Sequence, residues 1–306
     1  MKRRKSLKKT RERWYNEKVK ASFNGGDPVG DQQQTLKQTL SIQGEALHTG
    51  KMVTMTLIPQ PEDTGVRFCR SDLPGKPVLP AQPEHVVDTY RCTTLGNNDW
   101  RIRTIEHLMA ALHGLGVDNL LVEVEGEELP MGDGSAWYFA RAILETGLEA
   151  QAKPRRTRKV TAPVWVENGN SPRSYLLALP GEQLHISYFF TSNNNNVGNQ
   201  FYQLSVTPET FQKELASART IAFTYEIEAL RRQGLAQGGN FDVAVVVGEE
   251  GYLSDLRYPD EIARHKILDM LGDLYLLGPV TGKIIGIGSG HKMDLELVLR
   301  LRENLR

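Results

Sequence analysis

Two stretches of the chain share one pattern, an apolar helix that ends at glycine and leads through a short turn into a strand. They are TIEHLMAALHGLGVDNLLVEVEG (104–126) and RHKILDMLGDLYLLGPVTGKIIGIGSG (264–290). Glycine is typical of helix ends, and alternating apolar residues predict the strand that follows. The chain is therefore expected to fold as two α+β halves of similar design. Each helix carries a histidine in its first turns, and His107 and His265 would meet if the helices pack against each other.

Composition divides the 306 residues into four segments. Residues 1–34 are basic and then rich in Gly, Asp and Gln, which predicts a poorly ordered leader. Residues 35–150 form the first expected α+β domain and residues 160–306 the second. The charged, proline-broken stretch QAKPRRTRK (151–159) is the best candidate for a linker between them.

Local patterns predict individual elements. Alternation of Val53, Met55 and Leu57 with threonines indicates a half-buried strand. Thr104 is expected to cap the helix that carries His107. The apolar run FDVAVVVG (241–248) is typical of a strand buried on both faces. Further helices are predicted at 135–146, 208–217 and 224–233.

Charge and cysteine usage bear on location and partners. Residues 1–20 hold ten Lys or Arg and two Glu, so the leader could attract an anionic membrane surface weakly or bind nucleic acid. A disordered tail is the first interpretation, and no specific nucleic-acid partner is expected. Cys69 and Cys92 lack C-x-x-C spacing, and no secretory or membrane-spanning segment is evident, which together predict a cytoplasmic protein.

His265 and Asp269 stand four residues apart and so share one helix face. An isolated pair of this kind is more often a surface ion pair than half of a metal site. The second, similar helix favours the metal site over a surface ion pair, because His107 could supply the third ligand of a catalytic zinc. Two histidines and one carboxylate also suit Fe²⁺.

Four further residues could serve chemistry beside such a metal. Glu106 lies in an otherwise apolar segment and could act as general base on a water molecule. His291 follows the glycines of GIGSG, so a tight turn would present it as a general acid. Lys266 adds positive charge, while Asp273 is either a partner of these groups or a surface acid.

The motifs resemble those of a known family over residues 35–300. GEALHTGKMVTMTL, TIEHLMAALHGLGVDN, GDGSA, SARTIAF, GGNFD, RHKILDMLGDLYLLG and SGH occur in the order seen in UDP-3-O-acyl-N-acetylglucosamine deacetylases. The resemblance implies two α+β sandwich domains with the active site between them. It also implies zinc-dependent hydrolysis of the N-acetyl group of UDP-3-O-acyl-N-acetylglucosamine, with release of acetate, in lipid A synthesis.

Roles for single residues follow from that resemblance. It places the zinc ligands at His107, His265 and Asp269, and it makes Glu106 the general base. It makes His291 the acid, with Asp273 orienting it, while Thr220 bonds the oxyanion and Lys266 supports the substrate. The positions it assigns to substrate binding are His48, Thr94, Ile221 and Gly239.

The chain departs from the family pattern at three places. Ile221 stands where the family often has Phe. Residues 193–196 (NNNN) lie in the insert of the second domain that forms the acyl-chain passage in the family and is usually less polar. Residues 1–34 have no counterpart. Two alternatives therefore stay open: a zinc deacetylase of this fold acting on another acetamido-sugar, or a metal-free sugar-nucleotide binding homologue. A monomer is expected in either case.

Overall fold

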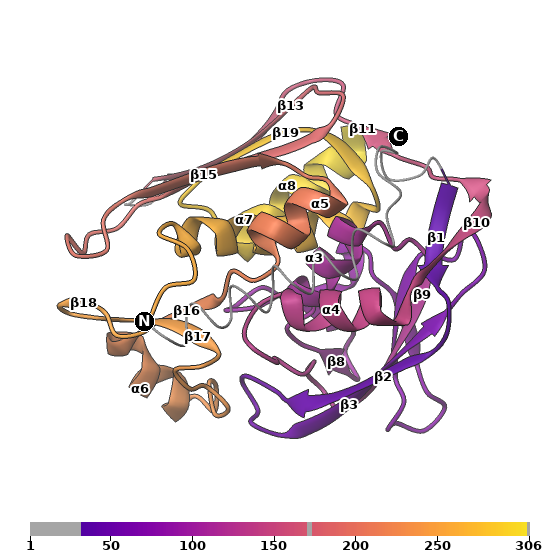
Figure 1. Ribbon diagram of the computed structural model, residues 1–306, viewed down its shortest axis with the longest axis horizontal. Helices are drawn as coiled ribbons and strands as arrows, with labels where there is room; N and C mark the ends of the chain where they lie inside the picture. The colour runs from indigo at the N-terminus through magenta and orange to yellow at the C-terminus, as the bar shows by residue number, and fades with distance from the viewer. Residues whose placement is uncertain (1–31, 170–172, 305–306) are drawn as a thin grey trace.

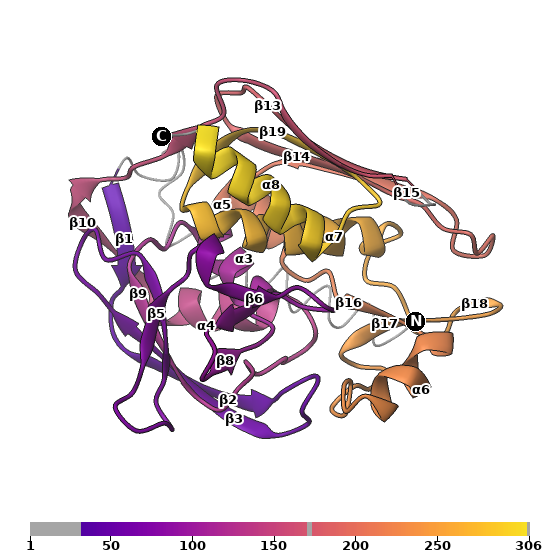
Figure 2. The same ribbon diagram turned by 180° about the vertical axis from the view of Figure 1, so that it is seen from behind.

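A computed structural model describes residues 32–169 and 173–304. Two mixed sheets form the outer layers, and helices fill the space between them (Figures 1 and 2). The first sheet contains β2 (Leu40–Glu45), β3 (Met52–Pro59), β9 (Leu120–Glu125), β4 (Val66–Arg70) and β5 (Val78–Pro80), in that order. The second contains β12 (Val164–Asn168), β13 (Ser174–Leu179), β19 (Val280–Ile287), β14 (Leu184–Phe190) and β15 (Gln200–Ser205), with β11 (Arg158–Lys159) beside β19. These layers confirm the predicted α+β class.

The two sheets follow the same path. Strands β9 and β19 are central, each antiparallel to the strand on one side (β3 or β13) and parallel to the strand on the other (β4 or β14). Helix α3 (Glu106–Leu115) leads into β9, and α7 (Glu261–Leu274) leads into β19. The repeated sequence pattern thus corresponds to a repeated topology.

The helices meet where the two halves join. Helices α3 and α7 pack directly on each other, flanked by α4 (Trp137–Thr146) and α8 (His291–Asn304). Close approach depends on Gly272 of α7, because an added Cβ there would lie 2.1 Å from the carbonyl oxygen of Glu106. The ring centroids of His107 and His265 are consequently 5.0 Å apart.

Smaller elements complete the fold. Strand β1 (Gln32–Leu36) pairs with β10 (Leu148–Pro154). The remaining strands form two three-stranded sheets: β6 (Val86–Asp88), β7 (Thr94–Gly96) and β8 (Arg101–Ile102), and β16 (Thr220–Phe223), β17 (Ala244–Gly248) and β18 (Gly251–Tyr252). Within the described ranges the other helical segments are η2 (Pro83–His85), α5 (Pro208–Thr210), η3 (Phe211–Leu215), α6 (Thr224–Arg232) and η4 (Tyr275–Leu277).

Some local predictions were wrong. Thr104 does not cap α3: its φ is +59° and its hydroxyl donates to Oε1 of Glu128 at 3.2 Å, while Ile105 precedes the helix. The expected leader ends earlier than predicted, because Gln33 is buried in β1 and its amide bonds Asp63 at 2.8 Å. Residues 1–31 lie outside the described part of the chain.

Other element boundaries also moved. Residues 151–154 of the expected linker belong to β10, which pairs with β1. The helix predicted at 135–146 begins at Trp137, and the buried run at 241–248 becomes a strand only from Ala244. The segment predicted as one helix at 208–217 contains α5 followed by the π-helical turn η3.

Candidate metal centre and catalytic site

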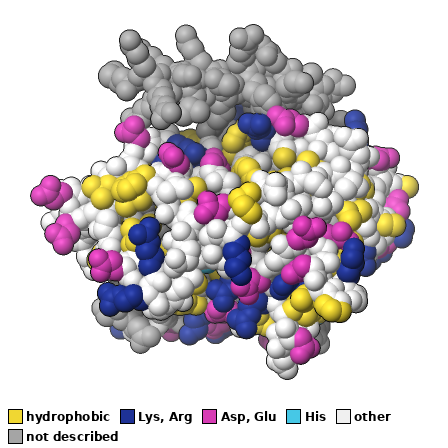
Figure 3. All heavy atoms as spheres, turned by 90° about the horizontal axis from the view of Figure 1, so that it is seen from below, with side chains coloured by type: hydrophobic (Ala, Val, Ile, Leu, Met, Phe, Trp, Pro, Cys, Tyr) yellow, Lys and Arg dark blue, Asp and Glu magenta, His cyan; other side chains and the backbone are white. Residues whose placement is uncertain are grey.

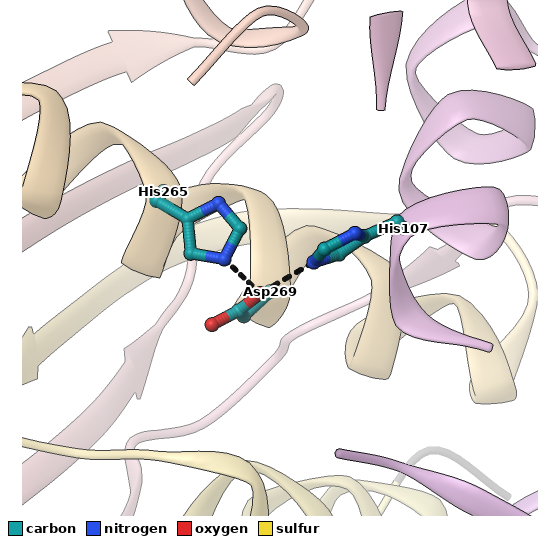
Figure 4. A group of neighbouring side chains, drawn as sticks. All are labelled: His107, His265 and Asp269. Atoms are coloured by element: carbon teal, nitrogen blue, oxygen red, sulfur yellow. Dashed lines mark ion pairs between the residues drawn. The ribbon is translucent and has the colours of Figure 1, made fainter. Parts of the chain in front are cut away.

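Three buried side chains converge between α3 and α7 (Figure 4). Oδ1 of Asp269 lies 3.2 Å from Nε2 of His265 on the same helix and 3.6 Å from Nε2 of His107 on α3. One potential ligand atom from each residue lies within 4.8 Å of the other two. The structure therefore brings together the three residues that the sequence predicted as metal ligands.

The hydrogen bonds of this group suit a metal ion. Nδ1 of His265 lies 3.1 Å from the carbonyl oxygen of Ala218, which can only accept, so Nδ1 carries the proton. In the neutral ring Nε2 then presents a lone pair. It faces Oδ1 of Asp269, which is buried and has no hydrogen-bond donor among the described residues. A metal ion between the two acceptors, as in two-histidine, one-carboxylate zinc sites, would satisfy both, and a second ring proton on His265 would do the same without a metal.

A buried ion pair fixes the carbonyl that orients His265. Arg219 Nε lies 2.9 Å from Oε1 of Glu261, the first residue of α7, and the Arg219 backbone N–H donates to the same oxygen at 3.1 Å. The pair ties residue 219 to the start of the helix. It thereby holds the preceding residue, Ala218, against His265.

The other oxygen of Asp269 faces a lysine. Lys266 Nζ donates to Oδ2 at 2.8 Å. Burial acts to raise the pKa of Asp269, but neighbouring His265 and Lys266 hold that pKa well below its usual range. Burial acts to lower the pKa of Lys266, yet Asp269 raises it above the ordinary value. Both side chains are therefore ionised at neutral pH.

Glu106 opens helix α3 and is buried. Its Oε2 accepts a hydrogen bond of 3.0 Å from the backbone N–H of Thr93. Burial raises the pKa of Glu106, against the opposing effects of His291 and His107. A carboxylate with a raised pKa, next to a metal ligand, is suited to take a proton from water.

His291 opens helix α8 and is oriented by a carboxylate. Its Nδ1 donates to Oδ2 of Asp273 at 2.8 Å, which leaves Nε2 on the side of Asp269, 3.9 Å from Oδ2. Burial acts to lower the pKa of His291, but the carboxylates of Asp273, Asp269 and Glu106 together raise it to about 10. His291 is therefore a cation at neutral pH, and Asp273, which is buried, is not a surface acid.

The predicted substrate-binding residues and Thr220 lie in three places. His48 is buried, and its loop runs beside that of Gly239, because Gly238 N–H donates to the Leu47 carbonyl at 3.0 Å. Thr220 and Ile221 are half-buried at the start of β16, and Thr94 is buried in β7. Their roles toward a substrate stay predictions.

Two residues of the site were missed in the sequence. Asp294 is buried within 4.8 Å of the Asp273–His291 pair, and its Oδ1 has no hydrogen-bond partner among the described residues. Burial and Asp273 raise its pKa to about 7. Its position three residues after His291 on a helix could have revealed it. Thr93 contacts both Glu106 and Asp273, and no sequence pattern distinguishes it from other threonines.

Known proteins are similar in sequence to this chain over nearly its whole length. The family model for UDP-3-O-acyl N-acetylglycosamine deacetylase matches residues 33–303. The chain is 40% identical to the "UDP-3-O-acyl-N-acetylglucosamine deacetylase" of Chlamydia abortus, covering 90% of this chain and 98% of that protein. It is 41% identical to the enzyme of that name from Acidithiobacillus ferrooxidans, covering 88% and 89% of the two chains. The protein therefore belongs to the UDP-3-O-acyl-N-acetylglucosamine deacetylase family.

Proposed function

We propose that this protein hydrolyses the N-acetyl group of UDP-3-O-acyl-N-acetylglucosamine and releases acetate, a step of lipid A synthesis. The strongest support for this proposal is that Glu106 and His291 flank a buried group of three potential metal ligands. A base and a cationic acid beside a metal site are what amide hydrolysis requires. Family membership supplies the substrate class.

His107, His265 and Asp269 are the residues that would hold Zn²⁺. Bound there, zinc would polarise the acetamide carbonyl and lower the pKa of a water molecule toward about 7. The same donors also suit Fe²⁺. The lone pairs of His265 and Asp269 that face each other support a metal at this position.

The chain's own groups move the protons. Glu106 accepts one proton from water as the water oxygen bonds to the acetamide carbon. His291, cationic at neutral pH, faces the developing oxyanion and donates a proton to the amine as the carbon–nitrogen bond breaks. Thr220 donates a hydrogen bond to the oxyanion, and Lys266 supports the substrate. The carboxylic acid formed passes its proton to the amine, so acetate and the protonated amino sugar leave, and transfer of the proton from Glu106 to His291 restores both groups.

Substrate recognition is assigned to His48, Thr94, Ile221 and Gly239. The contact between the loops of His48 and Gly239 supports a shared binding surface. Domains 35–150 and 160–306 remain a prediction, which the repeated sheet topology supports.

We assign the protein to the cytoplasm as a monomer. Both cysteines are free, which suits a reducing compartment. Among the described residues no helix is both long and apolar enough to span a bilayer. The described part of the face in Figure 3 mixes basic and acidic side chains, so it offers no single-sign patch for nucleic acid. Membrane contact through the basic residues 1–20 stays a prediction.

Matched substrates test the proposal. Acetate release is measured with UDP-N-acetylglucosamine and with its 3-O-acylated form. Faster turnover of the acylated sugar supports the proposal. Equal turnover of both, or turnover of another acetamido-sugar alone, points to the alternative deacetylase. No turnover and less than about a tenth of an equivalent of metal indicates a binding homologue.

A further inference from the structure

Thr93 is placed to hold the base and the acid at the same time. It is 1% exposed and lies just before β7, in the first half of the chain. Its backbone N–H donates to Oε2 of Glu106 at 3.0 Å, and its hydroxyl lies 2.6 Å from Oδ1 of Asp273 on α7. One residue therefore connects the two carboxylates across the junction between the halves.

The direction of the hydroxyl bond follows from the available proton. A threonine hydroxyl has one proton, and an ionised carboxylate only accepts, so Thr93 donates to Asp273. The hydroxyl oxygen then faces Nδ1 of His291 at 3.3 Å. Asp273 receives Thr93 on Oδ1 and His291 on Oδ2, at 2.6 and 2.8 Å. A donor on each oxygen fixes the rotation of the carboxylate, and with it the imidazole ring of His291.

The backbone of Thr93 is also held in place. Its carbonyl oxygen accepts the N–H of Ile105 at 3.3 Å, directly before α3 begins. The backbone carbonyl and N–H of Thr93 thus both bond to residues where α3 begins. The N–H is the group that orients the carboxylate of Glu106. Movement of Thr93 would displace the base and the acid together.

We propose that Thr93 is a positioning residue that sets Glu106 and the Asp273–His291 pair in a fixed relation for the reaction. This inference rests on the proposed function, because it uses the roles of Glu106 and His291 given there. Among the described residues, the side-chain groups that Thr93 bonds are those of Glu106, Asp273 and His291, and none of them is a predicted metal ligand. Its effect is therefore on the arrangement of reacting groups and not on substrate affinity.

The variant Thr93→Val tests the hydroxyl bond to Asp273, because valine has the shape of threonine and leaves the backbone N–H bond to Glu106 in place. The variant leaves Oδ1 of Asp273 without its donor. We expect kcat to fall about 10- to 100-fold with KM within about twofold, since a small misplacement of a catalytic group has effects of this size. Thr93→Ser retains the hydroxyl and should recover most of kcat.

Thr35→Val is the matched control. Thr35 is also buried, and its hydroxyl donates to the Asn119 carbonyl at 2.6 Å, but it lies in β1, away from the site. It should keep the wild-type kcat. If Thr93 were merely structural, Thr93→Val would unfold at lower temperature with unchanged kcat per folded molecule, and that result would overturn the inference. Should Thr93→Val not fold, Thr93→Ala replaces it with the same expectation.

A double substitution tests the path of the effect. In an Asp273→Asn background, Thr93→Val should cost less in kcat than it does alone, because the two residues act through one contact. Full additivity would contradict the coupling. The wild-type chain in the same assay separates the two claims: no acetate from wild type refutes the proposed function, while wild-type turnover matched by Thr93→Val refutes the role of Thr93 alone.

Discussion

Nε2 of His265 lies 3.2 Å from Oδ1 of Asp269, one turn further along α7. Nδ1, the other ring nitrogen of His265, bonds the Ala218 carbonyl, and Oδ1 of Asp269 has no hydrogen-bond donor among the described residues. Two unshared acceptors in a buried place are costly unless a cation joins them. His265 and Asp269, four residues apart, therefore form a potential metal site together with His107 of α3, whose Nε2 lies 3.6 Å from Oδ1 of Asp269.

Removal of one ligand should release the metal. His265→Ala leaves only two protein ligands, and we expect metal content to fall below about a fifth of an equivalent. His185→Ala is the control, because His185 lies in β14 with Nδ1 against Ser205 Oγ at 3.2 Å. Elemental analysis of both purified variants makes the comparison. A full equivalent of metal in His265→Ala would refute its assignment as a ligand.

Substitution of the base should separate binding from turnover. Glu106→Gln retains the shape of the side chain but cannot accept a proton, so kcat should fall at least about 100-fold. Metal content should stay near that of wild type, since Glu106 is not among the three ligands. Acetate release and elemental analysis on one preparation provide both values. Near-normal turnover would show that another group takes the proton.

The pH dependence should carry the signature of His291. Burial acts to lower its pKa, but Asp273, Asp269 and Glu106 together raise it to about 10, so the cation persists through neutral pH and is lost as the pH rises through about 10. We expect kcat to decline over that range, and the decline should vanish in His291→Gln, which starts from a lower kcat. The matching stability contribution is fully present below about pH 6.5 and is lost through about pH 10. Rate profiles between pH 6 and 10.5, flat for wild type, would contradict this.

Gly272 should be intolerant of any side chain. An added Cβ would lie 2.1 Å from the Glu106 carbonyl oxygen, so Gly272→Ala must push α3 and α7 apart. We expect the free energy of unfolding to fall by about 1–3 kcal/mol, as overpacking typically costs. Gly169→Ala is the control, because no atom of the described residues lies within 4 Å of its added Cβ. Equal denaturation midpoints for the two variants would mean that the helices are not in close contact.

Asp294→Asn should stabilise the protein above neutral pH. Burial and Asp273 raise the pKa of Asp294 to about 7, so the folded state binds its proton more tightly than the unfolded chain does. Its stability contribution is present at low pH and is lost as pH rises through about 7. At pH 8 the amide should increase the free energy of unfolding by about 1–3 kcal/mol, and this gain should shrink toward pH 5. Urea unfolding at both pH values measures it, and a gain independent of pH would contradict the raised pKa.

Periodicity accounts for much of what the sequence predicted. The apolar helices and the glycines that end them indicated two similar halves, and His107 with His265 indicated where these meet. Helix spacing alone placed Asp269 beside His265, because residues four apart share a face. The family resemblance then assigned the roles, which spacing could not.

Contacts between distant segments account for what was missed. Thr104 resembles a helix cap, but its hydroxyl donates a hydrogen bond to the buried Glu128 instead. Gln33 has no apolar side chain to mark a strand, yet Asp63 bonds it into β1. Thr93 meets Asp273 across 180 positions of sequence, and no local pattern records such a pairing. Tertiary hydrogen bonds override local propensity in each case.

The most direct measurement is acetate release from UDP-3-O-acyl-N-acetylglucosamine by the full chain, before and after removal of its metal. We expect turnover to be lost when a chelator removes the metal from His107, His265 and Asp269, and to return with one equivalent of Zn²⁺. Undiminished turnover in protein shown by elemental analysis to be metal-free would contradict it.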